Sequence, residues 1–154
     1  MKKLLLALCL LFSTTAFTAC GGDDDDVVIS INDLPQVSQN FLSTHFPNIG
    51  ARLVEKDNDS YDVILNNGFE IDFFLDGEWD SVDGISQPVP ESVLSLLPAA
   101  ILSDLKTNAP NSKVVEVNKE IVRNVFVGYE VTLDHKDGIE RKYDKEGNFI
   151  RIDD

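Results

Sequence analysis

The chain has 154 residues, 43% of them hydrophobic, and carries 27 acidic against 13 basic residues, for a formal net charge of −14. This size fits one domain or two very small ones, and the apolar content suffices for a packed core, which excludes wholesale disorder. The charge argues against nucleic acid, whose phosphates need clustered Lys and Arg, and against adsorption to anionic lipid. Two cysteines are too few for a disulfide framework or a Cys-rich zinc module.

Residues 1–19 are typical of a secretory signal. Two lysines precede an apolar run, Leu4 to Phe12, which is too short to cross a bilayer. The segment from Phe17 to Cys20 resembles the lipobox of bacterial lipoproteins, with Phe where Leu is usual. The resemblance implies that the signal is removed and that Cys20 carries lipid, palmitate included, which attaches the protein to the membrane. The alternative is an ordinary cleaved signal that leaves Cys20 as a free thiol.

Residues 20–26 are the lipidated Cys followed by a Gly- and Asp-rich run. Such a run is low in complexity and self-repelling, which predicts a flexible acidic tether. It resembles the surface-export signal that follows the lipid-bearing Cys in lipoproteins of Bacteroidota-type bacteria. The resemblance implies an outer-membrane lipoprotein exposed at the cell surface. The alternatives are a solvated spacer in the periplasm and a loose Ca²⁺-holding segment.

The rest of the chain reads as one unit written twice, because matching residue types recur in the same order at nearly constant offsets. The matched pairs are Leu34–Pro35 with Leu97–Pro98, Tyr61–Leu65 with Tyr129–Leu133, Asn67–Glu70 with Asp137–Glu140, Gly77 with Gly147 and Trp79 with Phe149. We therefore expect two units, residues 27–88 and 89–154, that share one sheet or pack side by side.

Each unit is expected to begin with a helix. Pro35 and Pro98 suit a first helical turn, and later prolines stop both helices. The expected apolar stripes are Val37, Phe41 and Leu42 in the first helix and Ile101, Leu102 and Leu105 in the second. A short helical turn, Glu91 to Leu96, precedes the second helix. Val27 to Ile31 is expected to be an extended lead-in that docks on a sheet edge.

About four antiparallel strands follow each helix. The alternating segments include Ala51–Lys56, Tyr61–Leu65 and Phe69–Phe73, and the inward residues of the last two are Tyr61, Val63, Leu65, Phe69, Ile71 and Phe73. Asn67–Gly68 and Asp137–Gly138 are strong hairpin signals. The second unit carries extra residues around Lys119 to Val125.

The pattern Leu-Pro, Phe-Pro after a helix, Tyr-x-Val-x-Leu, Asn-Gly-x-Glu and Gly-x-Trp resembles the PepSY-like family over roughly Ile31 to Ile152. This resemblance implies an α+β fold of two tandem helix-plus-antiparallel-sheet units like the β-lactamase inhibitor protein fold. The second unit departs at Ala109, where an aromatic residue is usual. The family implies no settled activity, and fold alone does not confer one.

We expect no enzyme, no metal site and no cofactor. His45 and His135 are the two histidines, and neither has the spacing of a metal ligand. His45 falls in the last turn of a helix, where a positive charge is mildly favourable, and His135 falls in a solvated hairpin. Asp57–Asp59 starts like a calcium loop but lacks its later ligands, which predicts a turn. The sequence has no nucleophile elbow or phosphate-binding loop.

What remains is a surface for binding on the open sheet face. Its candidate partner-binding residues are Asp62, Asn67, Gly68, Glu70, Asp72, Phe74, Phe126, Glu130 and Glu140. Acids with interspersed aromatics fit a basic partner, and the β-lactamase inhibitor protein uses such a face with a projecting hairpin. We expect a non-enzymatic protein-binding module, an inhibitor or accessory subunit of a secreted or surface protein. The alternatives are a small-ligand or cation-binding envelope sensor and an ordinary solvated acidic face.

Overall fold

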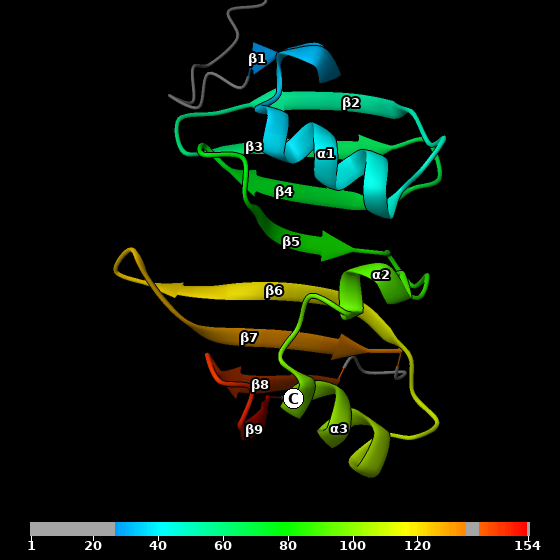
Figure 1. The fold of residues 1–154 in the computed structure, drawn as a ribbon, viewed down its shortest axis with the longest axis vertical. Coiled ribbons are helices and arrows are strands. Elements are labelled where there is room, and N and C mark those ends of the chain that lie inside the picture. The colour runs from blue at the N-terminus through cyan, green and yellow to red at the C-terminus, as the bar shows by residue number, and fades with distance from the viewer. Residues whose placement is uncertain (1–26, 135–138, 154) are drawn as a thin grey trace, which may run out of the picture.

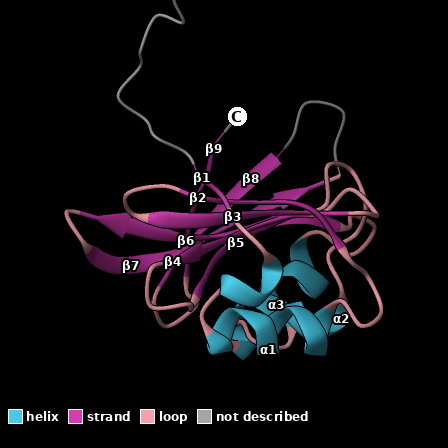
Figure 2. Ribbon diagram, turned by 90° about the horizontal axis from the view of Figure 1, so that it is seen from above, coloured by secondary structure: helices cyan, strands magenta, loops and turns pink. Residues whose placement is uncertain are grey.

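The computed structural model describes residues 27–134 and 139–153. They form one antiparallel sheet of nine strands in sequence order, with the helices on one face (Figures 1 and 2). The elements are β1 (Val27–Val28), a 3₁₀ turn (Ile31–Asp33), α1 (Gln36–His45), β2 (Ala51–Lys56), β3 (Ser60–Leu65), β4 (Glu70–Phe74), β5 (Trp79–Asp83), α2 (Glu91–Leu94), α3 (Ala99–Asn108), β6 (Val114–Val122), β7 (Val125–Leu133), β8 (Ile139–Asp144) and β9 (Phe149–Asp153).

The expected α+β class is confirmed at this level, as an antiparallel sheet covered on one face by helices. The lead-in also docks as expected, because Val27 and Val28 pair with the last two residues of β2. In the part of the chain that the structure describes, no helix combines the length and apolar character needed to cross a membrane. The expectations for the signal, for Cys20, for His135 and for Asp137–Gly138 lie outside the described residues.

Proline sets the start of α1 and α3. Pro35 and Pro98 are the N-cap residues, and both helices end just before the next proline. The expected stripe of α1 is wrong at Val37, which is 45% exposed, whereas Ser38 is fully buried. Ser38 faces the sheet because its hydroxyl donates a 3.0 Å hydrogen bond to the carbonyl of Gly77. A long-range contact thus decides which face of this helix turns inward.

The alternation of β3 and β4 is confirmed. Val63, Leu65, Ile71 and Phe73 are each at most 1% exposed, and Tyr61 packs on the edge of this core. The β3–β4 turn differs from the expected two-residue form. The amide of Gly68 donates to the carbonyl of Leu65, and Gly68 has a φ of +91°, so the loop is longer and Gly68 closes it as a bulge residue.

The two halves of the sheet, β1–β5 and β6–β9, meet at a narrow seam between β5 and β6. Only Ser81–Asn118, Val82–Val117 and Asp83–Glu116 pair there. Beyond β5 the chain continues along the seam, where the amides of Gly84 and Val89 donate to carbonyls of β6. Helix α2 follows and covers this region of the sheet, burying Val93 completely (Figure 1). The seam is therefore held by few strand hydrogen bonds and by apolar cover.

Candidate functional site

The face of the sheet opposite the helices is open, and its side chains fall into two cross-strand rows. The first row passes from Asp62 to Asp72, Ser81, Asn118, Glu130 and Lys142, each paired with the next. The second row passes from Ile64 to Glu70, Asp83, Glu116, Thr132 and Glu140 in the same way. The structure thus brings five of the candidate residues into two neighbouring rows, three in the first and two in the second.

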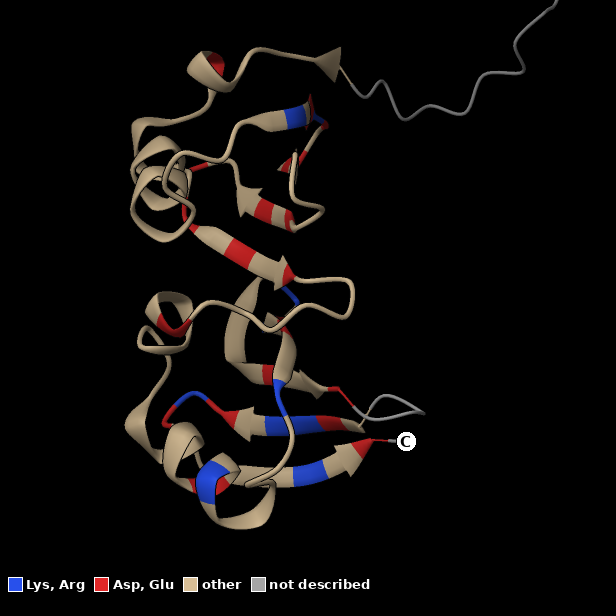
Figure 3. Ribbon diagram, turned by 90° about the vertical axis from the view of Figure 1, so that its right-hand side faces the viewer, with Lys and Arg blue, Asp and Glu red and all other residues tan. Residues whose placement is uncertain are grey.

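The N-terminal part of these rows is an acidic patch, which we define as Asp62, Glu70, Asp72 and Asp83. Among the described residues, none of the four forms an ion pair. Asp72 accepts a 2.6 Å hydrogen bond from the Ser81 hydroxyl. Burial raises the pKa of Asp72, and repulsion from the other three carboxylates raises it further. Figure 3 shows acidic residues along the strands of this half.

In the C-terminal part of the rows, Lys142 compensates some of the carboxylates. The ammonium of Lys142 lies 2.7 Å from Glu130, 3.0 Å from Glu120 and 3.4 Å from Asp153. Hydrogen bonds to these carboxylates raise the pKa of Lys142. Arg151 adds a two-point contact to Asp153. Glu130 is therefore committed to an internal ion pair, whereas Glu116 and Glu140 of the second row, like the four residues of the acidic patch, form no ion pair among the described residues.

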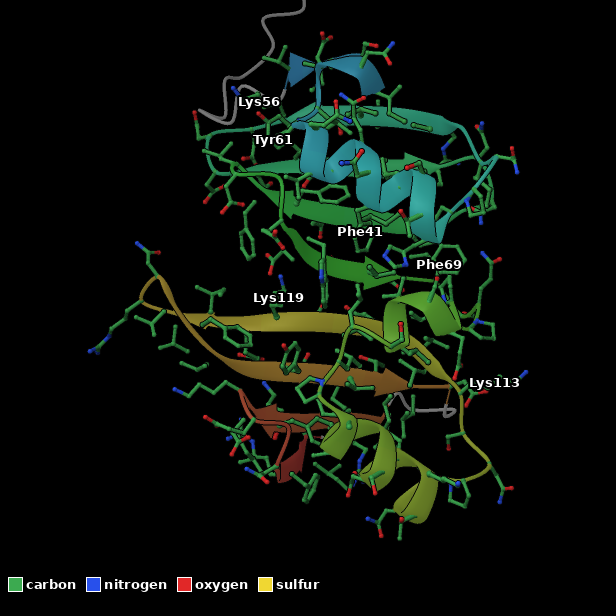
Figure 4. All side chains as sticks on the ribbon, viewed as in Figure 1. Phe41, Lys56, Tyr61, Phe69, Lys113 and Lys119 are labelled. Carbon is green, nitrogen blue, oxygen red and sulfur yellow. The ribbon has the colours of Figure 1, made fainter. Side chains whose placement is uncertain are left out.

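Phe74 lies at the seam and is half-buried rather than open. Its cover comes from Lys119 of β6, whose ammonium sits 5.8 Å from the Phe74 ring centroid and 4.4 Å from that of Trp79 (Figure 4). Trp79 is buried under α1, as expected of a core plug. Burial lowers the pKa of Lys119, which the carboxylates of Glu78 and Asp80 oppose. One cation from the C-terminal half thus covers two aromatics of the N-terminal half.

Asn67 and Gly68 lie at the opposite end of the strands from Lys119, beside Phe69 (Figure 4). The carbonyl of Asn67 accepts a 2.9 Å hydrogen bond from the Gln87 side chain, which ties the turn to the segment before α2. This hairpin is therefore braced against the body and does not join the two rows.

Phe126 lies on a different hairpin, which the extra residues of the second unit extend. We call residues 119–127 the arm. β5 pairs with β6 only as far as Asn118, and β8 reaches β7 only as far as Gly128, so the arm has no neighbouring strand on either side. The Phe126 ring packs edge-to-face on Tyr129 at 5.1 Å. Figure 1 shows the β6–β7 hairpin projecting from one side of the sheet.

The histidine and the calcium-like segment have structural surroundings. His45 ends α1 and packs on Phe41, with ring centroids 4.5 Å apart. Burial lowers the pKa of the His45 imidazole. The carboxylate of Asp57 accepts from the amides of Asp59 and Ser60, which makes the expected turn. No group of three potential metal ligands occurs among the described residues.

Three shallow cavities of about 180, 250 and 350 Å³ lie at the β1–β2 edge, beside α1 and beside α3. None of them is lined by a candidate residue. The candidate site is therefore a surface and not a pocket. Sequence reasoning missed Asp83, although alternation from Val82 could have placed it on the open face. It also missed that the extra residues near Lys119 would form an arm with five exposed apolar side chains.

The sequence model of the family described as "putative beta-lactamase-inhibitor-like, PepSY-like" matches residues 59–151. The chain belongs to this PepSY-like family, as its motifs predicted. No curated protein matches the sequence significantly.

Three solved structures from Bacteroides are similar along most of the chain. One, from Bacteroides thetaiotaomicron, is described as a "putative calcium-regulated periplasmic protein"; it is 33% identical, with a TM-score of 0.73, covering 84% of this chain and 98% of its own. A "putative periplasmic protein" from Bacteroides vulgatus is 35% identical, with a TM-score of 0.74, covering 86% and 100%. A second protein from that species, "of unknown function", is 30% identical, with a TM-score of 0.74, covering 84% and 99%.

Proposed function

We propose that the protein is a non-enzymatic lipoprotein of the cell envelope that binds a basic protein partner through the open sheet face. The observation that carries the proposal is the acidic patch, four carboxylates in adjacent rows without an ion pair among the described residues. Their mutual repulsion is unfavourable in the free protein, and a partner's Lys and Arg side chains would relieve it. Lys142 compensates Glu120, Glu130 and Asp153, and no Lys or Arg among the described residues does the same for the acidic patch.

A protein partner fits this face better than a small molecule does. Small ligands are taken up in concave sites, and the three cavities lie away from the candidate residues. The patch spans three strands and is bordered by half-buried Ile64 and Phe74, which offer apolar contact beside the charges. The role would be that of an inhibitor or accessory subunit, and nothing in the site specifies a β-lactamase as the target.

The cell envelope is the proposed location. The similar Bacteroides proteins are described as periplasmic, and the signal and lipobox of this chain support lipid attachment at Cys20. The acidic tether, residues 21–26, supports export to the outer surface of the outer membrane. Protease treatment of intact cells tests the last step: digestion of the domain supports surface exposure, and full protection places it on the periplasmic side.

We also propose that the sheet is built from two tandem units, residues 27–88 and 89–154. Support comes from the repeated order of one helix and four strands, α1 with β2–β5 and α3 with β6–β9. A Cβ on Gly77 would lie 2.6 Å from the Pro35 ring, and one on Gly147 would lie 2.7 Å from Pro98. The same close approach of a turn glycine to a helix-start proline therefore occurs in both halves.

Crosslinking in cells, affinity purification and mass spectrometry test the binding proposal. The test variant is Asp62→Lys with Glu70→Lys, which places cations beside Asp72 and so relieves its repulsion without threatening the fold. The matched control, Glu91→Lys with Glu146→Lys, makes the same charge change at exposed sites off the acidic patch. We expect one dominant partner with the wild type and the control, and loss of it with the test variant. Equal capture by all three proteins would refute the proposal.

Cation binding is the second candidate function. Asp62 and Asp72 lie opposite each other on the neighbouring strands β3 and β4. Burial and repulsion between carboxylates raise the pKa of Asp72, and a bound divalent ion would reduce the repulsion. The description of one relative as calcium-regulated points the same way. A rise in melting temperature with CaCl₂ but not with NaCl of equal ionic strength, lost in the Asp62→Lys variant, would support it. Equal effects of both salts would reject it.

A further inference from the structure

The arm is an element that the fold itself does not need. It is a two-stranded ribbon closed by Arg123 and Asn124, whose φ values are +51° and +62°. An isolated ribbon of two strands is marginally stable in water, because it has no third strand or helix to pack on. Residues 119–127 are nevertheless paired to the tip, with Val122 opposite Val125.

Five side chains of the arm are apolar and exposed. The exposed fractions are 39% for Ile121, 51% for Val122, 60% for Val125, 36% for Phe126 and 40% for Val127. Two cross-strand apolar pairs, Ile121 with Phe126 and Val122 with Val125, thus cover the two faces of the ribbon at its tip, and exposed apolar residues gathered in this way mark contact with another body. Their exposure costs solubility without adding to the core beneath the helices.

The arm projects from the end of the sheet at which the chain enters it. Val27 pairs with Lys56, and Lys56 pairs with Tyr61. Figure 4 shows Lys56, Tyr61 and Lys119 at one end of the strands and Phe69 and Lys113 at the other. Cys20 lies a few residues upstream of Val27, and the intervening chain reaches at most about 25 Å. A lipid anchor at Cys20 therefore holds this end of the domain close to the membrane.

The charge of the arm suits a lipid surface. From Ile121 to Tyr129 the chain has no acidic residue and one basic residue, Arg123 at the turn. Glu120, at the base of the arm, is paired with Lys142 at 3.0 Å. Valine, isoleucine and phenylalanine beside a tyrosine and an arginine are the residues that partition into the interface between headgroups and acyl chains.

The neighbouring turns at this end decide which lipid is preferred. They carry Asp57, Asp59, Asp76 and Glu78, which would be repelled by an anionic surface. A zwitterionic surface, such as phosphatidylethanolamine, does not impose that repulsion. The arm thus offers apolar contact to neutral lipid and little electrostatic attraction to acidic lipid.

We propose that the arm inserts its tip into the membrane to which Cys20 attaches the protein. The inference rests on the lipid anchor of the proposed function. Two attachment points, the lipid and the arm, would fix the orientation of the domain, whereas the lipid alone would leave it tumbling on its tether. The acidic patch lies on the sheet body near the base of the arm, because Asp72 pairs with Ser81 and Ser81 with Asn118, and insertion of the tip alone would leave it accessible to a protein partner.

The test uses the mature full-length lipoprotein reconstituted into phosphatidylethanolamine–phosphatidylcholine vesicles. Val125→Cys carries an environment-sensitive NBD label, and Val37→Cys, an apolar site on α1 with 45% exposure, is the matched control. We expect NBD emission at position 125 to rise at least threefold and to be quenched by a headgroup-level doxyl lipid, with no change at position 37. Adding Val122→Asp should abolish the rise, and vesicles rich in phosphatidylglycerol should reduce it.

Intact-mass analysis of the same samples distinguishes failure of the arm proposal from failure of the lipid-anchor proposal. Unchanged emission at position 125 with lipid-modified Cys20 would overturn the arm proposal and leave the anchor standing. An unmodified Cys20 would overturn the anchor and the arm proposal that rests on it. A rise that requires a soluble protein fraction instead of vesicles would assign the arm to a protein contact and overturn membrane insertion.

Discussion

The space between helix and sheet is filled differently in the two halves of the molecule. Under α1, Phe41 packs on Phe73 at 5.6 Å and on Trp79 at 6.2 Å. Under α3, Asp104 stands at the place of Phe41 and binds Arg141 at 2.6 Å. The same helix position relative to its starting proline is therefore aromatic in one half and charged in the other.

In the charged arrangement, Asp104, Arg141 and Tyr143 all have hydrogen-bond partners within the group. The Tyr143 hydroxyl donates to Asp104 at 2.8 Å, and Arg141 also stacks on the Phe149 ring at 4.4 Å. Although partial burial opposes ionisation of Asp104, hydrogen bonds from Tyr143 and Arg141 lower its pKa overall. Both halves nevertheless share the close approach of a turn glycine to the proline that starts the helix. The filling beneath the helix is exchangeable as long as no buried group is left without a partner.

The largest expected effect is a loss of unfolding free energy in the N-terminal half, where aromatic side chains pack under the helix. Phe73→Ala removes a fully buried ring and leaves a cavity, which should cost about 4 kcal/mol of unfolding free energy. Urea unfolding followed by circular dichroism measures it. Phe149, which matches Trp79 in the repeat, is 44% exposed in the other half, and Phe149→Ala should cost about 1 kcal/mol. Equal losses in the two halves would break the comparison.

Placing the aromatic and aliphatic residues of the first half at the matching positions of the C-terminal half tests the comparison further. Asp104→Phe alone leaves Arg141 buried without its carboxylate and should cost about 3 kcal/mol. Adding Arg141→Ile and Tyr143→Phe copies the residues of the first half, Phe41, Ile71 and Phe73, and should restore stability to within about 1 kcal/mol of the wild type. A triple variant no more stable than the single one would show that the network is not exchangeable.

Asp80 at the seam should make stability depend on pH. Burial raises its pKa to about 6, and Asp80 Oδ1 is buried without a hydrogen-bond partner among the described residues. The folded protein then binds this proton at a higher pH than the unfolded chain does, so stability rises as pH falls through 6 and is lost as pH rises. Asp80→Asn should add about 1 kcal/mol at pH 7.5, since solvent screening reduces the effect at this half-buried site.

Melting temperatures of wild type and Asp80→Asn between pH 4.5 and 8 measure this effect. The difference between the two proteins should shrink as pH falls below 6, and it should vanish only near the ordinary Asp pKa of 3.8, where the unfolded chain is protonated as well. A constant difference across the range would mean that the carboxylate does not titrate near 6.

The smallest expected effect concerns the arm. Val125→Ser should change the unfolding free energy by less than about 0.5 kcal/mol, because the side chain is 60% exposed and packs on no helix. Thermal unfolding of the two proteins in the same buffer checks it. A loss above 1 kcal/mol would show that the arm packs on the body of the domain, which would also weaken its assignment as a membrane contact.

Local rules were enough for much of the fold. Proline fixed the helix starts, alternation gave the strands and their buried faces, and the same alternation put Asp62, Glu70 and Asp72 on the open face. Contacts between residues far apart in the chain could not be predicted from the sequence. The inward turn of Ser38 depends on Gly77, and the cover of Phe74 depends on Lys119 across the seam. Residues 119–125 were visible as extra, but Arg123–Asn124 is not a strong turn signal, so the arm was not predicted.

The candidate site was predictable in part for the same reason. The sequence pattern places the carboxylates on one face of the sheet, but the register of the strands decides which of them lies beside a cation. The pairing that sets Lys142 opposite Glu130 leaves Asp72 opposite Ser81, so the first carboxylate has a cation across the strand and the second does not. Asp83 completes the patch because β4 and β5 pair Glu70 with it.

Site-specific photo-crosslinking in living cells tests the proposed binding role most directly. A benzoylphenylalanine residue at position 70 probes the acidic patch, and one at position 91 probes the helix-covered side of the same protein. The account predicts a discrete crosslinked protein from position 70, weakened when Asp62 is also changed to Lys, and none from position 91. Identical products from both positions, or products from position 91 alone, would contradict binding through the open face.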